Sequence, residues 1–215
     1  MIEAVVFDLD GLLIESEEVW DEVREALAHE YGGRWSESAQ RDMMGMSSPE
    51  WSRYMHETVG LVQAPEEING LVVERMAERY RSQLPLLPGA VEAVERIASR
   101  WPLGVASSSN RALIDLVLEL SGLAPRFRAT VSSEEVARGK PAPDVYLEAA
   151  RRLGVAPTHA AAVEDSGAGI RSASTAGMRV VAIPNRSFPP GEDALELADA
   201  VLESLVELTP EAIEG

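Results

Sequence analysis

The stretch Ile2-Glu3-Ala4-Val5-Val6-Phe7-Asp8-Leu9-Asp10-Gly11 decides the fold of this chain. Residues 2–7 form a short apolar run with the composition of a strand that is buried on both faces of a sheet. The run ends at two aspartates that are separated by one position and followed by a glycine. Because side chains alternate along a strand, Asp8 and Asp10 begin on the same side of the chain.

Two carboxylates this close repel each other unless a cation or a shared proton lies between them. The pair Asp8 and Asp10 therefore suggests a Mg²⁺ ion, with one carboxylate free to attack a substrate or to transfer a proton. The alternative is a capped strand end with two solvated acids, since a bare pair of aspartates at this spacing is common. The two residues alone leave both interpretations open.

Composition restricts the class of protein. At 215 residues the chain can bury a substantial core, either as one large domain or as a domain with an insertion. The absence of cysteine excludes disulfides, thiolate metal sites and a cysteine nucleophile. No apolar run approaches the ~20 residues that span a bilayer, and the chain starts without a signal-peptide pattern, so we expect a cytoplasmic protein. The net charge of −17 argues against nucleic acid and anionic membranes as partners.

Lysine usage is unusual in this chain. Lys140 is its only lysine, and arginine supplies the rest of the 19 basic residues. The lysine lies in the segment Arg138-Gly139-Lys140-Pro141-Ala142-Pro143-Asp144, whose shape two prolines constrain. A lysine ammonium is a compact point charge that fits among carboxylates and a phosphate, whereas a guanidinium is a wide planar fork. Lys140 is therefore a candidate functional residue, and the alternative is that one lysine was kept by chance.

Strand-like and helix-like segments alternate along most of the chain. This alternation predicts an α/β fold with a doubly wound parallel sheet. The predicted strands are residues 2–7, 103–106, 129–131, 160–163 and 179–183, with a short edge strand at 200–201. The predicted helices between them are residues 90–99, 111–120, 145–153 with Asp144 as N-cap, and a last one from Ser166 to near Gly177.

Residues 16–84 break this alternation. They contain no strand-like run, and Gly32-Gly33 and Gly45 separate the first three of their helical patterns. The pattern predicts an all-helical cap at residues 16–84, inserted after the first strand of a core made of residues 1–15 and 85–215. The helices expected in the cap are residues 17–30, 36–43, 49–59 and 65–81.

Polar candidate residues follow the carboxyl ends of the first four predicted strands. Ligands of parallel sheets bind outside these strand ends, so we expect the candidates to lie together at one edge of the sheet. Random surface acids and serines would be spread over both edges, so this distribution indicates a functional site. The candidates are Asp8 and Asp10, Ser107 and Ser108, Lys140, and Glu164 and Asp165.

With these motifs in this order, the chain resembles the haloacid dehalogenase superfamily of phosphohydrolases. The resemblance covers nearly the whole chain. Residues 12–17 and 139–144 carry a finer match to the beta-phosphoglucomutase-like branch, which includes sugar-phosphate phosphatases. The resemblance implies a Rossmann-like core with a helical cap, and a Mg²⁺-dependent phosphatase for small phosphorylated metabolites such as sugar phosphates.

The resemblance also implies catalytic roles for the motif residues. Asp8 would be the nucleophile that forms an aspartyl phosphate, and Asp10 would protonate the leaving oxygen and then deprotonate water. Lys140 would neutralise Asp8 and the developing charge on the phosphoryl group. Ser107 and Ser108, with Lys140, would bind the phosphate.

The same resemblance implies a metal site. Mg²⁺ would lie between Asp8, the backbone carbonyl of Asp10 and Asp165, with Glu164 either as a direct ligand or one layer further out. A bound cation and Lys140 would explain how several acids tolerate an incoming phosphate dianion.

Two cap positions bear on the type of enzyme. Beta-phosphoglucomutases carry a histidine on the first cap helix and basic cap residues that hold a second phosphate. The matching positions here hold Trp20 and Ser48. This difference favours a phosphatase over a mutase, but the mutase stays as the alternative because Arg53 or Arg75 could hold the second phosphate.

Two other classes of protein share some of these features. A receiver domain also gathers acids, a hydroxyl residue and a lysine on a parallel sheet, but it has no cap and its phosphorylated aspartate does not follow the first strand. A catalytically silent binding protein would have little reason to keep all four motifs. The expected partner is therefore a small phosphorylated metabolite, bound by a monomer or weak dimer with no nucleic-acid or membrane partner.

Other conspicuous cap residues are predicted to be structural. The cluster Met43-Met44-Gly45-Met46 is expected to pack between cap helices rather than to line a substrate pocket. Trp35 and Trp51 are expected in the cap core. Trp20 is the exception to watch, because it lies on the first cap helix near the expected cleft.

Overall fold

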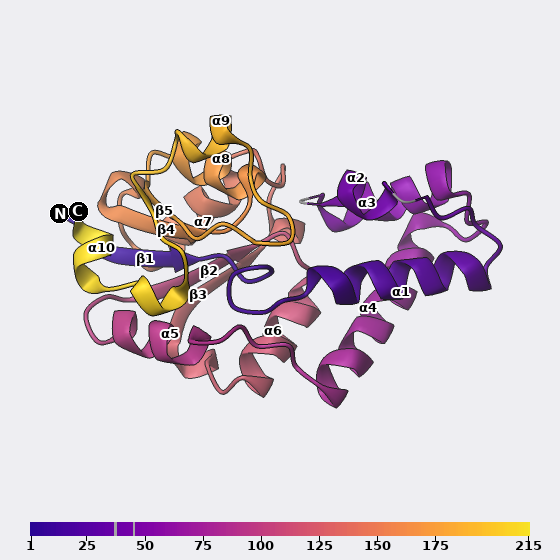
Figure 1. Ribbon diagram of the computed structural model, residues 1–215, viewed down its shortest axis with the longest axis horizontal. Coiled ribbons are helices and arrows are strands. Elements are labelled where there is room, and N and C mark those ends of the chain that lie inside the picture. The colour runs from indigo at the N-terminus through magenta and orange to yellow at the C-terminus, as the bar shows by residue number, and fades with distance from the viewer. Residues whose placement is uncertain (37, 45) are drawn as a thin grey trace.

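The computed structural model describes residues 1–36, 38–44 and 46–215 (Figure 1). Gly45, expected to separate two cap helices, lies outside the described residues. A parallel six-stranded sheet with the order β3-β2-β1-β4-β5-β6 confirms the predicted doubly wound fold. Its strands are β1 (Ala4–Phe7), β2 (Leu103–Ser107), β3 (Phe127–Ser132), β4 (Ala160–Glu164), β5 (Arg179–Ala182) and β6 (Ala200–Val201).

Strand β1 lies at the centre of the sheet, between β2 and β4. All four of its residues are buried, as its apolar run predicts. Val5 and Phe7 pack on one face of the sheet with helices α5 (Ala90–Ala98) and α6 (Arg111–Leu120). Val6 packs on the opposite face with α7 (Asp144–Leu153) and α8 (Gly167–Thr175). Helices therefore cover both faces of the sheet (Figure 1).

The core helices begin and end close to the predicted positions. The side chain of Ser166 accepts a hydrogen bond from the amide of Gly169, which makes Ser166 the N-cap of α8. Gly154 ends α7 in a left-handed conformation that glycine adopts without strain. Asp144, predicted as an N-cap, is instead the first residue of α7, and its carboxylate binds the Arg138 guanidinium.

Two short helices complete the core. They are α9 (Glu192–Leu195), which lies next to α8, and α10 (Pro210–Glu214), which lies near the chain termini (Figure 1). In the part of the chain that the structure describes, no helix is both long and apolar enough to cross a membrane.

The segment between β1 and α5 is helical, and Figure 1 shows it to one side of the sheet. Two of its helices differ from the prediction, because the second begins only at Ala39 and the third changes to a π-helical turn over Met55–Val59. Gly60, with a positive φ of 89°, ends that turn. The helices are α1 (Glu17–Glu30), α2 (Ala39–Met43), α3 (Ser48–Tyr54) and α4 (Pro65–Ser82).

The chain connects these helices to the sheet through two adjacent segments. Ile14 forms an antiparallel bridge with Leu86, so the outgoing and returning chains lie side by side. We propose the same domain boundaries as the sequence suggests, with residues 16–84 as the cap and residues 1–15 and 85–215 as the core, because only this pair of segments joins them in sequence.

Candidate active site

The predicted residues meet at the carboxyl ends of β1, β2 and β4, at the edge of the sheet that adjoins the cap. A cavity of about 480 Å³ opens there, a size typical of small-molecule sites. Among the predicted residues, Asp8, Asp10, Ser108, Lys140 and Asp165 line the cavity. The other two, Ser107 and Glu164, are fully buried and form hydrogen bonds with these lining residues.

Lys140 lies among acids, as its uniqueness in the sequence suggests. Its Nζ is 2.7 Å from Oδ1 of Asp8 and 2.5 Å from Oε1 of Glu164. The ammonium group also lies 5.1 Å from the centre of the Tyr146 ring, so a cation–π contact adds to the two ion pairs. Burial alone would lower the pKa of Lys140, but the Asp8 and Glu164 carboxylates outweigh it and raise that pKa above its usual value. The lysine therefore stays charged.

The acids around Lys140 are Asp8, Glu164 and Asp165, and one ammonium group cannot neutralise three carboxylates. Burial, followed by repulsion from Glu164, raises the pKa of Asp8 to about 7, although Lys140 opposes the shift. Burial and the Asp8 carboxylate raise the pKa of Asp165 well above its usual value. Ligand oxygens of Asp8, Glu164 and Asp165 lie within 4.8 Å of one another. This cluster resists ionisation unless a cation joins it.

Asp165 supplies an independent sign of a cation site. Its Oδ1 atom is buried, and none of the described residues makes a hydrogen bond to it. Burying a carboxylate oxygen without a partner is unfavourable unless the oxygen binds a ligand, water or an ion. Gly11 leaves room for the other oxygen, since a Cβ at position 11 would overlap Oδ2 of Asp165. The donor set of hard carboxylate oxygens fits a divalent cation such as Mg²⁺.

Glu164 is fully buried, and protein donors already occupy its carboxylate. Oε1 accepts from Lys140 and from the Tyr146 hydroxyl at 2.7 Å. Oε2 accepts from the amide of Asp165 at 3.1 Å and from the amide and hydroxyl of Ser166. Because its oxygens are engaged in this way, Glu164 is better suited to hold Lys140 and Asp165 in place than to bind a metal directly.

The Asp10 carboxylate connects the core to the cap. Oδ1 accepts from the Ser16 hydroxyl at 2.7 Å and from Nε1 of Trp20 at 3.3 Å. Oδ2 accepts from the hydroxyls of Ser107 at 3.2 Å and Ser109 at 2.7 Å. Within the described ranges, the Asp10 side chain is not part of the acidic cluster, so its part in a metal site through the backbone carbonyl stays a prediction.

Sequence reasoning missed two of these partners, Ser16 and Ser109. Ser109 directly follows the candidates Ser107 and Ser108, and Ser16 belongs to the segment 12–17. The Ser107 hydroxyl donates to Asp10 and accepts from the Ser109 amide at 2.9 Å, and its role in binding phosphate stays a prediction. Ser108 keeps the predicted place on the cavity wall.

The cap forms the opposite wall of the cavity. Met43, Met44 and Met46 line it, although the sequence favoured packing between cap helices, and Met43 is also buried in a hydrophobic cluster. Trp20 lies on the cavity wall as expected, and Trp51, expected in the cap core, is buried and reaches the same wall.

Sequence reasoning also missed two of the cavity's cations, Arg24 and Arg41. Of the described residues, the arginines and lysines on the cavity wall are Arg24, Arg41 and Lys140. Arg75, considered for a second phosphate, pairs with Glu30 at 2.6 Å, and Arg53 is exposed outside the cavity wall. Arg24 sits on a helix with six acidic residues, where a basic side chain is expected to form surface ion pairs, so its burial could not be predicted.

Known proteins resemble this chain along its whole length. A family model for haloacid dehalogenase-like hydrolases matches residues 2–177. Hexitol phosphatase B of Escherichia coli strain K12 is 35% identical over 224 residues, which cover 100% of this chain and 97% of that protein. Protein CbbY of Rhodobacter capsulatus is 34% identical over 206 residues, or 89% of either chain. The crystal structure of CbbY from Rhodobacter sphaeroides in complex with phosphate matches with a TM-score of 0.88 and 27% identity over 100% of both chains.

Proposed function

Because the chain belongs to the haloacid dehalogenase-like hydrolase family, we propose that it is a Mg²⁺-dependent phosphatase for small phosphorylated metabolites, sugar phosphates foremost. The observation that carries the proposal is the buried group of Asp8, Lys140 and Asp165 on the wall of a cavity that the cap completes. Relatives with phosphatase names, such as hexitol phosphatase B, support a phosphorylated sugar or polyol as substrate.

The metal would be held by Asp8 and Asp165, with the backbone carbonyl of Asp10 as a further ligand. When bound, Mg²⁺ would screen the charge of the carboxylates and of the incoming phosphate dianion. Glu164 would keep Lys140 and the Asp165 backbone in position through the hydrogen bonds that occupy its carboxylate.

The reaction would proceed in two transfers at Asp8. A carboxylate oxygen of Asp8 attacks phosphorus, the ester bond breaks, and Asp10 gives a proton to the leaving oxygen. Asp10 then takes a proton from water, which attacks the aspartyl phosphate and restores the free Asp8 carboxylate. Lys140 and Ser108 bind oxygens of the phosphoryl group during both transfers.

Replacing Asp10 by asparagine should affect substrates unequally. The amide cannot transfer a proton, so kcat for a sugar phosphate should fall about 10²- to 10⁴-fold. Phosphorylation of Asp8 by an activated aryl phosphate, whose leaving group needs little protonation, should persist at a reduced rate. A rapid-quench assay of aryl alcohol release measures that step. Equal losses for sugar and aryl phosphates would contradict the role of Asp10 as the acid.

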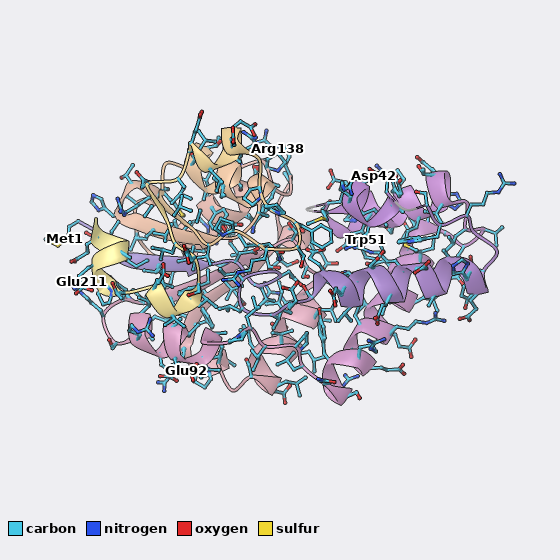
Figure 2. All side chains as sticks on the ribbon, viewed as in Figure 1. Met1, Asp42, Trp51, Glu92, Arg138 and Glu211 are labelled. Atoms are coloured by element: carbon cyan, nitrogen blue, oxygen red, sulfur yellow. The ribbon has the colours of Figure 1, made fainter. Side chains whose placement is uncertain are left out.

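Mg²⁺ should stabilise the protein through Asp165. At about 100 times its Kd, the ion should raise Tm by about 5–10 °C in a thermal unfolding experiment. Asp165→Asn should lose most of this shift, because one of the two proposed carboxylate ligands is gone. Glu92→Gln, on the core far from the cap (Figure 2), serves as the matched control and should keep the full shift. An undiminished shift in Asp165→Asn would place the cation elsewhere.

The experiment that tests the proposed function separates a phosphatase from a phosphosugar mutase. Beta-glucose 1-phosphate is supplied with Mg²⁺ and a catalytic amount of the 1,6-bisphosphate, and phosphate release is compared with isomer formation. We expect steady phosphate release without any need for the bisphosphate. Rapid formation of glucose 6-phosphate without stoichiometric phosphate release would identify a mutase.

The remaining predictions concern the setting of the enzyme. We propose a cytoplasmic monomer or weak dimer without nucleic-acid or membrane partners, supported by the net charge of −17. Sedimentation equilibrium over a range of protein concentrations measures the oligomeric state.

A further inference from the structure

One face of α1 carries polar and aromatic side chains into the cavity. Glu17, Trp20 and Arg24 are spaced three and four residues apart, so they lie on the same side of the helix. All three line the cavity on the side of the cap. Trp20 reaches the core through its bond to Asp10, whereas Glu17 and Arg24 have no such link to the core acids among the contacts of the described residues.

Arg24 is held in an unusual environment. Only 5% of the residue is exposed. Its guanidinium carbon lies 4.4 Å from the centre of the Trp20 ring and 4.9 Å from that of Trp51. Contacts with two indoles stabilise a cation that burial would otherwise disfavour. Burial lowers the pKa of Arg24 to about 10 even though Glu17 opposes the shift, so the side chain remains charged at neutral pH.

The hydrogen bonds of Arg24 are incomplete. Nη1 donates to Oε1 of Gln40 at 3.1 Å, and Nε2 of Gln40 donates to Oε2 of Glu17 at 2.8 Å. The Nε atom of Arg24 is buried and has no hydrogen-bond partner anywhere in residues 1–36, 38–44 and 46–215. Burying a donor without a hydrogen-bond partner is unfavourable, and it costs more when the donor belongs to a charged group. A ligand or water that accepts a hydrogen bond from Nε would remove this cost. Arg24 therefore has donor capacity left for a bound molecule.

We propose that Glu17 and Arg24 recognise the end of the substrate that is remote from the phosphate, and that this end is uncharged and bears hydroxyl groups. This inference rests on the proposed phosphatase function and makes the substrate a sugar or polyol monophosphate. Hydroxyls both donate and accept, so they match a carboxylate and a guanidinium placed next to each other. Trp20 and Trp51 also line the cavity, and their rings suit the C–H groups of a sugar or polyol chain.

The same geometry disfavours a second phosphate at this end. A phosphate dianion has only acceptor oxygens, and Glu17 presents a further acceptor beside Arg24. Gln40 joins Glu17 to Arg24, and although burial raises the pKa of Glu17 to about 7, above that pH the Glu17 carboxylate offsets the charge of Arg24. A bisphosphate would therefore meet repulsion where a monophosphate with free hydroxyls finds complementary partners.

Arg24→Met tests the proposal. The variant keeps an apolar stem against the two indoles but removes the hydrogen-bond donors. Sorbitol 6-phosphate and glucose 6-phosphate are each compared with p-nitrophenyl phosphate, whose remote end has no hydroxyl. For each of the two, the measured selectivity ratio is its kcat/KM divided by kcat/KM for p-nitrophenyl phosphate. We expect this selectivity ratio to fall about 10-fold or more, the effect of losing hydrogen bonds to a charged group. Arg79→Met, at an exposed ion pair with Glu22 outside the cavity wall, should keep the wild-type ratio.

Two further measurements complete the test. Arg24→Lys keeps a cation but lacks the Nε donor, so it should also lower the ratio, and it decides the question if Arg24→Met does not fold. Wild-type enzyme should prefer both monophosphates to fructose 1,6-bisphosphate. An unchanged ratio in both variants, or a preference for the bisphosphate, would overturn the inference. Absence of any Mg²⁺-dependent hydrolysis, p-nitrophenyl phosphate included, would instead reject the proposed function itself.

Discussion

Asp8→Asn should abolish turnover while leaving the protein folded. An amide in place of the carboxylate cannot attack phosphorus, so we expect kcat to fall by at least about 10⁴-fold. The fold should survive because an asparagine oxygen can still accept the hydrogen bond from Lys140, and because the substitution removes a charge that repels Glu164 and Asp165. The measurement is phosphate release from a sugar phosphate with saturating Mg²⁺, with circular dichroism to check the fold.

Asp115→Asn is the matched control for this substitution. Asp115 is an exposed aspartate on α6 that forms a surface ion pair with Arg111, so its loss should leave kcat near the wild-type value. Incubation of both variants with labelled substrate, followed by acid quench, detects phosphate bound to protein. Substantial Mg²⁺-dependent hydrolysis by Asp8→Asn would rule out Asp8 as the nucleophile.

Lys140→Arg should be far more damaging than an exchange of two cations on the surface. The ammonium fits between Asp8 and Glu164 and against the Tyr146 ring in a buried site, and a planar fork cannot reproduce these contacts of a point charge. A guanidinium there should displace Asp8 and the phosphoryl oxygens. We expect kcat to fall about 10²-fold or more, which corresponds to about 2.7 kcal/mol of transition-state stabilisation.

The reverse exchange at a neighbouring position controls for the loop. Arg138 is exposed (Figure 2), and it pairs with Asp144, so Arg138→Lys should leave kcat nearly unchanged. Of the 19 lysine and arginine positions of the chain, all except Lys140 hold arginine. A general intolerance of arginine therefore cannot account for a loss at position 140. Near-normal kinetics in Lys140→Arg would show that the single lysine is accidental.

The sheet and the edge where the candidate residues meet could be predicted from sequence. Strands β1 and β4 are buried on both faces, so their apolar runs are nearly continuous and end abruptly at Asp8 and Glu164. Parallel strands all present their carboxyl ends at one edge, which brings distant motifs together whatever the details of packing. The predicted bounds of α1 and α6 were correct for a similar local reason, because their apolar positions recur at helical spacing.

Local signals were weaker in the cap. The change from α3 to a π-helical turn at Met55 leaves the apolar pattern almost unaltered, so the sequence predicted one continuous helix. The methionine cluster could equally face a helix or a cavity, because the same flexible apolar side chain suits both surroundings. Only the position of the cap beside the sheet turned Met44 and Met46 toward the cavity.

By itself, the sequence determined the fold class, the family and which motif residues gather at one edge of the sheet, because these depend on periodicity and strand order, which are local properties. The tertiary structure alone decided how those residues are used. It engaged the Glu164 carboxylate with protein donors, joined Asp10 to Trp20 of the cap, and buried Arg24 against two indoles. Such contacts join segments distant in sequence, and their energies depend on burial and on distances of a few ångströms that no local pattern encodes.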